Sequence, residues 1–92
     1  MGYEFEWDPA KERTNRRKHG VSFDEATSIF ADPFSLNMSD PSHSVAEERF
    51  LVLGRSAKAR LLLVAYAERG FRTRLISART ASPAERRLYD ED

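Results

Sequence analysis

The sequence contains no cysteine, and that absence excludes two classes of small protein. Without thiols the chain has neither a disulfide framework nor a thiolate metal site. Only two histidines are present, so a zinc site would need carboxylate ligands, and no HxxxH spacing occurs. No stretch approaches the ~20 apolar residues that span a membrane. We therefore expect no metal, no cofactor and no insertion into a membrane.

A net charge of one sign is also missing. The 15 basic and 15 acidic residues cancel, which argues against broad non-specific attraction to nucleic acid. Most of the cations are nevertheless arginine, whose planar fork matches phosphate and carboxylate. They are spread along the whole chain, so only folding could gather them into a local basic groove.

Length and N-terminal composition place the chain in a simple class. The 92 residues are enough for one domain, 1–92, with a modest core. The N-terminus lacks the basic and then apolar pattern of a secretion signal, so we expect a cytoplasmic protein.

Hydrophobic periodicity and turn residues predict an order of β-α-α-β-β-β-β-α. The expected strands are 3–7, 34–38, 48–55, 60–68 and 71–79, and the expected helices are 9–19, 23–31 and a short helix from Ser82-Pro83 onward. This order predicts an α+β domain, an antiparallel sheet with two N-terminal helices and a short C-terminal helix. A turn at 68–70 would place Tyr66, Arg72 and Arg74 on one face of the last hairpin.

The first helix has clear ends and an unusual face. Asp8 followed by Pro9 is typical of a helix start, and Gly20 suits the left-handed position that closes a helix. Helical spacing places four polar residues on one face: Lys11, Asn15, Lys18 and His19. Packing alone does not explain this face, because a plain structural helix would carry an apolar stripe there. The second helix begins with a capping box made of Ser22 and Glu25.

Short motifs follow one another along nearly the whole chain. They are Phe5-Glu6-Trp7-Asp8, Asn15…Arg17-Lys18-His19-Gly20-Val21-Ser22-Phe23, Asp32-Pro33, His43-Ser44…Glu47-Glu48-Arg49, Gly54, Arg60, Tyr66, Arg69-Gly70, Ile76-Ser77-Ala78-Arg79 and Glu85-Arg86…Tyr89. In combination they resemble the BrnT toxin family. The resemblance implies a RelE-like fold and the ribonuclease half of a type II toxin–antitoxin pair. It also implies a BrnA-like ribbon-helix-helix antitoxin, which alone would contact operator DNA.

Cleavage of RNA without a metal needs groups that the first helix and the last strands can supply. A base must activate the 2′-hydroxyl, an acid must protonate the leaving 5′-oxygen, and cations must stabilise the phosphorane. Histidine titrates near neutrality and can move the protons, while lysine and arginine can hold the charge. The expected catalytic residues are Lys18, His19, Arg60 and Arg79. Alternatively, Lys18 and His19 only cap the helix, and Arg79 only pairs with a carboxylate such as Glu85.

Other residues could bind the substrate, which we expect to be mRNA whose cleavage inhibits translation. The expected substrate-binding residues are Lys11, Asn15, Arg74, Tyr66 and Trp7, and further possible site residues are His43, Glu48 and Tyr89. Trp7 is either part of the core or a platform on which a base stacks. His43 lies in a polar loop close to Glu48, an arrangement that also fits a structural role or a contact with an antitoxin.

A binding module without chemistry is the alternative function. It would bind RNA or an antitoxin and act in operator-DNA autoregulation. The predicted α-β-β-β-α stretch also fits a double-stranded RNA-binding domain. The start of its last helix offers only Arg86 and Arg87 as cations, whereas that fold needs a dense lysine cluster there.

Overall fold

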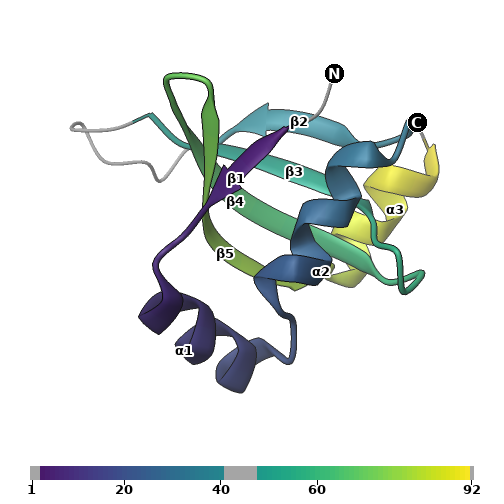
Figure 1. Ribbon diagram of the computed structural model, residues 1–92. Helices are drawn as coiled ribbons and strands as arrows, with labels where there is room; N and C mark the ends of the chain where they lie inside the picture. The colour runs from purple at the N-terminus through teal and green to yellow at the C-terminus, as the bar shows by residue number, and fades with distance from the viewer. Residues whose placement is uncertain (1–2, 41–47, 92) are drawn as a thin grey trace.

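A five-stranded sheet forms the centre of the computed structural model, which describes residues 3–40 and 48–91 (Figure 1). The strands are β1 (Glu4–Glu6), β2 (Leu36–Ser39), β3 (Phe50–Arg55), β4 (Leu61–Arg69) and β5 (Arg72–Thr80). Their order is β1-β5-β4-β3-β2, and every neighbouring pair is antiparallel except β1 and β5, which are parallel. The sheet is therefore mixed, and the prediction of an antiparallel sheet holds for every pair of strands except β1 and β5. No hairpin links β1 to β5, so nothing local forces them to run in opposite directions.

Helical segments cover both faces of this sheet. They are α1 (Pro9–His19), α2 (Phe23–Thr27), a 3₁₀ helix η1 (Ser28–Ala31) and α3 (Pro83–Glu91). Figure 1 shows α2 crossing one face of the sheet, α3 on the other, and α1 beside the end of β5. The predicted α+β fold with two N-terminal helical segments and a short C-terminal helix is confirmed. No helix within 3–40 and 48–91 has the length and apolar character to cross a membrane.

The ends of α1 follow from its capping residues. The Asp8 Oδ1 accepts a hydrogen bond from the Ala10 amide at 2.9 Å, and Pro9 occupies the first helical position. Gly20 has a φ of +70° and donates its amide to the Arg16 carbonyl at 2.8 Å. A side chain at this φ would be strained, which is why glycine ends the helix at the predicted place.

The second helix is shorter than predicted as an α-helix. The Thr27 hydroxyl donates to the Asp24 carbonyl at 2.7 Å, and the Ser28 hydroxyl donates to the Glu25 carbonyl at 2.6 Å. These bonds occupy carbonyls that an α-helix needs further along, and the chain continues as the 3₁₀ helix η1. Half of the expected capping box is present, because the Ser22 Oγ accepts from the Glu25 amide at 3.0 Å. The Glu25 carboxylate instead binds Arg60.

Two apolar clusters hold the layers together. The larger one joins α2 and η1 to the sheet and contains Val21, Phe23, Ala26, Ile29, Val52, Leu62, Val64, Tyr66, Leu75 and Ala78. The smaller one lies on the opposite face and contains Leu53, Leu61 and Leu63, with Tyr89 of α3 packed against it. Strand β4 is buried between the two clusters, which explains why neither face of its sequence is polar.

The β4–β5 hairpin has a different register from the one predicted. Arg69 pairs with Arg72, so the loop is Gly70-Phe71, and Gly70 has the positive φ that tight hairpin loops need. Tyr66 pairs with Leu75, whereas Ala65 pairs with Ser77, so a β-bulge leaves Ile76 as the extra residue. Between the bulge and the hairpin loop, each β5 side chain lies on the opposite face from the one that regular alternation would give it. Arg72 and Arg74 therefore lie on the face opposite Tyr66, and their predicted placement is wrong.

Candidate functional site

An open groove of about 520 Å³ lies between α1 and the edge of β5, and we call it the α1 groove. Its lining residues are Ala10, Lys11, Thr14, Asn15, Lys18 and His19 from α1, with Arg49, Ile76 and Ser77. All four polar residues that the sequence placed on one helical face thus line a single groove. The polar face of α1, which packing alone does not explain, forms one wall of this groove.

The α1 groove is basic although the chain as a whole is neutral. Lys11, Lys18 and Arg49 line it beside His19, and none of the described lining residues is acidic. Within residues 3–40 and 48–91 no carboxylate forms an ion pair with these three cations. A groove with unneutralised cations raises the local concentration of anions.

Asn15 fixes α1 to the sheet and thereby sets the shape of the groove. Its side chain is buried, and its Nδ2 donates to the Ala78 carbonyl at 2.8 Å and to the Val21 carbonyl at 3.1 Å. Its Oδ1 accepts from the Ala78 amide at 3.1 Å. The amide group therefore pairs with the edge of β5 as a neighbouring strand would. Asn15 lies at the predicted place, but its polar atoms are committed to the fold.

The β-bulge contributes the wall opposite α1. Ile76 is its extra residue and Ser77 follows, and both line the groove. Just beyond them Ala78 is held by Asn15. Bulges bend a strand and redirect side chains, and they are common beside active sites.

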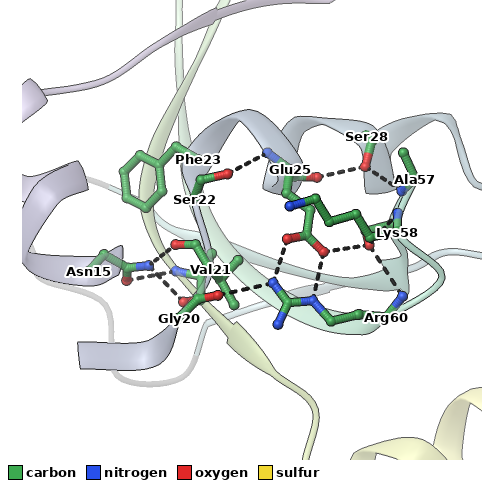
Figure 2. A network of polar contacts seen from close by, with 12 residues as sticks. Asn15, Gly20, Val21, Ser22, Phe23, Glu25, Ser28, Ala57, Lys58 and Arg60 are labelled. Carbon is green, nitrogen blue, oxygen red and sulfur yellow. Dashed lines mark hydrogen bonds and ion pairs between the residues drawn. The ribbon is translucent and has the colours of Figure 1, made fainter. Parts of the chain in front are cut away.

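A second polar cluster holds the end of α1 (Figure 2). Arg60 donates from Nε to Glu25 Oε2 at 2.9 Å and from Nη2 to Glu25 Oε1, and Nη2 also donates to the Gly20 carbonyl at 3.0 Å. The Ser56 hydroxyl donates to Glu25 Oε2 at 2.7 Å. Figure 2 shows the guanidinium between the Glu25 carboxylate and Gly20. Gly20 directly follows His19, so this cluster anchors the chain next to the groove.

The Glu25–Arg60 pair is stable as an ion pair. The hydrogen bonds from Arg60 hold the pKa of the Glu25 carboxyl below its usual range, although burial opposes the shift. The bond to Glu25 raises the pKa of Arg60. The Arg60 side chain is 38% exposed, and among the described residues no acceptor binds its Nη1. Arg60 can therefore keep Glu25 and still offer Nη1 to an anion.

Arg79 lies at the C-terminal end of β5 and binds α3. Its Nη1 and Nη2 donate to the two carboxylate oxygens of Glu85 at 2.9 and 2.8 Å. Glu85 also accepts from the Ser82 amide at 2.8 Å, and Ser82 Oγ accepts from the Glu85 amide at 3.2 Å, which completes a capping box. The bonds from Arg79 lower the pKa of Glu85 despite partial burial. Arg79 does not line the groove.

Three of the predicted substrate-binding residues lie elsewhere. Trp7 packs edge-on against Phe23 with the ring centroids 5.8 Å apart. Tyr66 is buried and donates its hydroxyl to the Asn37 Oδ1 at 2.6 Å, and burial raises its pKa. Arg74 pairs with Glu6 of β1 across 3.2 Å. None of these three lines the α1 groove.

The further candidates are also outside the groove. Tyr89 of α3 donates its hydroxyl to the Asp32 Oδ2 at 2.7 Å, a bond that raises the pKa of Tyr89. Arg55 stands over the Tyr89 ring, 5.4 Å from its centroid. Glu48 is exposed, and His43 lies outside the described residues. Within 3–40 and 48–91 no three histidine or acidic side chains gather closely enough to hold a metal ion.

Arg49 is the groove residue that the sequence reasoning did not single out. It directly precedes β3 and lines the groove together with the β5 bulge. The signal was present, because Arg49 closes the motif His43-Ser44…Glu47-Glu48-Arg49. Only the folded sheet brings it next to α1.

Comparisons with known proteins agree on one family and one fold. A protein family described as "Ribonuclease toxin, BrnT, of type II toxin-antitoxin system" matches residues 7–85. The crystal structure of the Brucella abortus ribonuclease toxin BrnT is similar, with a TM-score of 0.64 and 23% sequence identity. The likeness covers 87% of this chain and 97% of that one, and it establishes a shared fold. No curated protein sequence matches the chain.

Proposed function

Because the chain belongs to the BrnT family of ribonuclease toxins of type II toxin–antitoxin systems, we propose that it cleaves RNA in the α1 groove without a metal. The composition of the groove is the observation that supports this location for the cleavage of RNA. It gathers Lys11, Lys18 and His19 on one wall, and within 3–40 and 48–91 no acidic residue lines it. An RNA strand brings the negative charge that such a groove lacks.

In the proposed reaction the 2′-oxygen attacks the adjacent phosphorus as the bond to the 5′-oxygen breaks. The products are a 2′,3′-cyclic phosphate and a free 5′-hydroxyl. His19 accepts the proton from the 2′-hydroxyl, and the imidazolium so formed or a water molecule delivers a proton to the leaving 5′-oxygen. Lys18 stabilises the charge on the phosphorane. Arg60 does not line the groove, and we propose that it reaches the RNA from beside the groove with its Nη1. Lys11 binds a flanking phosphate.

The activity itself is tested with purified protein and RNA in EDTA. We expect fragments with 2′,3′-cyclic phosphate ends, because the proposed chemistry uses only side chains. RNA that stays intact at a large excess of protein, both with and without EDTA, would contradict an enzymatic role. Retention of that RNA on a filter would then favour the binding module. Cleavage that appears only when divalent ions are present would contradict the metal-free version.

Variants of α1 locate the active groove. We expect His19→Ala and Lys18→Ala each to lower the cleavage rate at least about tenfold, as loss of one preorganised group usually does. Arg13→Ala is the matched control, because Arg13 is an exposed cation of the same helix outside the groove. Equal losses of cleavage rate in all three variants would mean that the overall positive charge of α1 matters, and not the groove residues in particular.

Arg60 and Arg79 need a control that separates contact with RNA from support of the fold. Arg60→Ala removes the guanidinium, whereas Glu25→Gln weakens its anchor and leaves the guanidinium in place. Arg79→Ala and Glu85→Gln form the same kind of pair. A loss of cleavage confined to the arginine variants supports direct contact with RNA. Equal losses within a pair assign that arginine to the fold.

The cellular role follows from the same proposal. We propose that the RNA is mRNA, that its cleavage inhibits translation, and that a BrnA-like ribbon-helix-helix antitoxin neutralises the toxin and contacts operator DNA. Expression of the wild type should then arrest growth. His19→Ala or co-expression of such an antitoxin should relieve the arrest. Persistent arrest with a variant that cleaves no RNA would separate toxicity from ribonuclease activity.

A further inference from the structure

We propose that Arg49 binds a phosphate of the RNA backbone from the wall of the α1 groove opposite α1, so that cations hold the strand from both sides. This inference rests on the proposed function, because it assumes that RNA occupies the groove. It adds a residue to which neither the family assignment nor the helix pattern gives a role.

The position of Arg49 is fixed by the sheet. It directly precedes β3, and its main-chain carbonyl accepts a hydrogen bond from the Asp40 amide at 3.0 Å. Its side chain is partly buried and lines the groove with Ile76 and Ser77. A side chain on a strand end is held more firmly than one on a loop, so Arg49 meets a ligand in a defined geometry.

One donor of the Arg49 guanidinium, the Nε, is buried without an acceptor among the described residues. Arg60 and Arg79, by contrast, each bind both oxygens of a carboxylate. A shielded N–H without an acceptor is costly, and a phosphate offers two oxygens that match the Nε and Nη fork. A small movement of the guanidinium towards a bound phosphate would satisfy it.

The surroundings favour an anion that is part of a chain. Lys11 and Lys18 stand on the α1 wall, and among the described lining residues no carboxylate could neutralise Arg49. The groove is open and about 520 Å³ in volume, so a strand can lie along it. An acidic segment of an antitoxin is the competing anion, but its carboxylates do not repeat along the chain as phosphates do.

Binding is measured with full-length protein and a 2′-O-methyl RNA oligonucleotide, which cannot be cleaved, over a range of salt concentrations. For Arg49→Gln we expect about tenfold weaker binding and a log–log salt slope smaller by about 0.7, the value for one phosphate contact on a single strand. Arg49→Lys keeps the charge and should restore most of the slope but not the affinity. Arg13→Gln is the matched control. Circular dichroism reports folding, and Arg49→Lys carries the test if Arg49→Gln does not fold.

Cleavage assays separate this inference from the proposed function. With cleavable RNA, Arg49→Gln should raise KM while kcat changes little, because a flanking phosphate is bound equally before and during the reaction. If the wild type cleaves RNA and Arg49→Gln matches Arg13→Gln in slope and KM, the role of Arg49 is overturned and the function stands. If nothing is cleaved but the slope still falls, the function fails and the phosphate contact stands. If Arg49→Gln leaves RNA binding unchanged but weakens the binding of an acidic antitoxin, the proposed phosphate contact of Arg49 is also overturned.

Discussion

The cations of the α1 groove and the arginines that hold the fold differ in what binds them. Lys11, Lys18 and Arg49 line the groove without a carboxylate partner among the described residues. Arg60 and Arg79 are each held by both oxygens of a glutamate. The acidic residues that the structure describes therefore lie outside the groove lining. A net charge of zero is compatible with a locally basic site.

The two sets also differ in what they connect. Arg60 links the β3–β4 turn to α2 and to the end of α1, and Arg79 links β5 to α3. The side chains of the groove cations form no ion pair that links segments of the described chain. Removing a groove cation should therefore cost function and little stability, whereas removing a partner of a paired arginine should cost stability first.

Loss of the Asn15 amide should have the largest effect on stability, because it frames the groove without carrying charge. Asn15→Ala leaves buried donors and acceptors of Ala78 and Val21 unpaired, and we expect the free energy of unfolding to fall by about 2–4 kcal/mol. Urea titration measures it. Asn15→Asp keeps the acceptor for the Ala78 amide but places a buried carboxylate against the Ala78 and Val21 carbonyl oxygens. At neutral pH it should therefore lower the free energy of unfolding at least as much as Asn15→Ala. A loss below that of Thr14→Ala would contradict the role of Asn15.

Breaking the Glu25–Arg60 pair should have the next largest effect. Glu25→Ala leaves a partly buried guanidinium without its carboxylate, and we expect a loss of about 2–3 kcal/mol. The double variant Glu25→Ala/Arg60→Ala is the control, since removing both partners leaves no uncompensated charge. A double variant less stable than the sum of the single losses would contradict direct coupling.

The same pair predicts a dependence on pH. Hydrogen bonds lower the pKa of Glu25 and of Glu85 in the folded state, so each carboxylate contributes stability above its unfolded pKa of about 4.3. That contribution is lost as the pH falls below this value through the lowered folded pKa. Glu25→Gln should therefore flatten the stability profile below about pH 4.5 relative to the wild type. Parallel profiles for the two proteins would contradict the shift at Glu25.

The Arg79–Glu85 pair should have a smaller effect, because it is more exposed. The Glu85 side chain is 25% exposed, against 3% for Glu25. We expect Glu85→Gln to cost about 1 kcal/mol, the sum of a weakened ion pair and capping box. Hydrogen exchange should show faster opening of α3 with little change in α1. Equal acceleration in both helices would mean that the pair supports the whole fold.

The groove cations should have the smallest effect on stability. For Lys11→Ala and Lys18→Ala we expect changes within about 0.5 kcal/mol, as for exposed residues without partners. Weakened RNA binding with an unchanged unfolding curve would establish that the groove cations serve binding and the paired arginines serve stability. A loss of stability comparable to that of Glu85→Gln would contradict this difference.

Local chemistry in the sequence predicted the parts that depend on neighbours along the chain. Asp8, Pro9 and Gly20 mark the ends of α1 because capping is decided within a few residues. The helical period likewise placed Lys11, Lys18 and His19 together.

Long-range pairing could not be predicted in the same way. Nothing near Ile76 in the sequence announces the bulge, which depends on the fit of two strands. Glu25 was assigned to a capping box because its partner Arg60 lies 35 residues away. Arg49 meets α1 only through the sheet. The errors therefore fall on strand register and on contacts between distant segments.

The bond from Asn15 to β5 has a consequence for how copies of the protein behave towards one another. The part of β5 beyond β1 would otherwise present free amides and carbonyls, the template on which a strand of another molecule can add. By occupying Ala78, α1 closes that edge. We therefore expect variants that loosen α1 from β5 to precipitate more readily than the wild type.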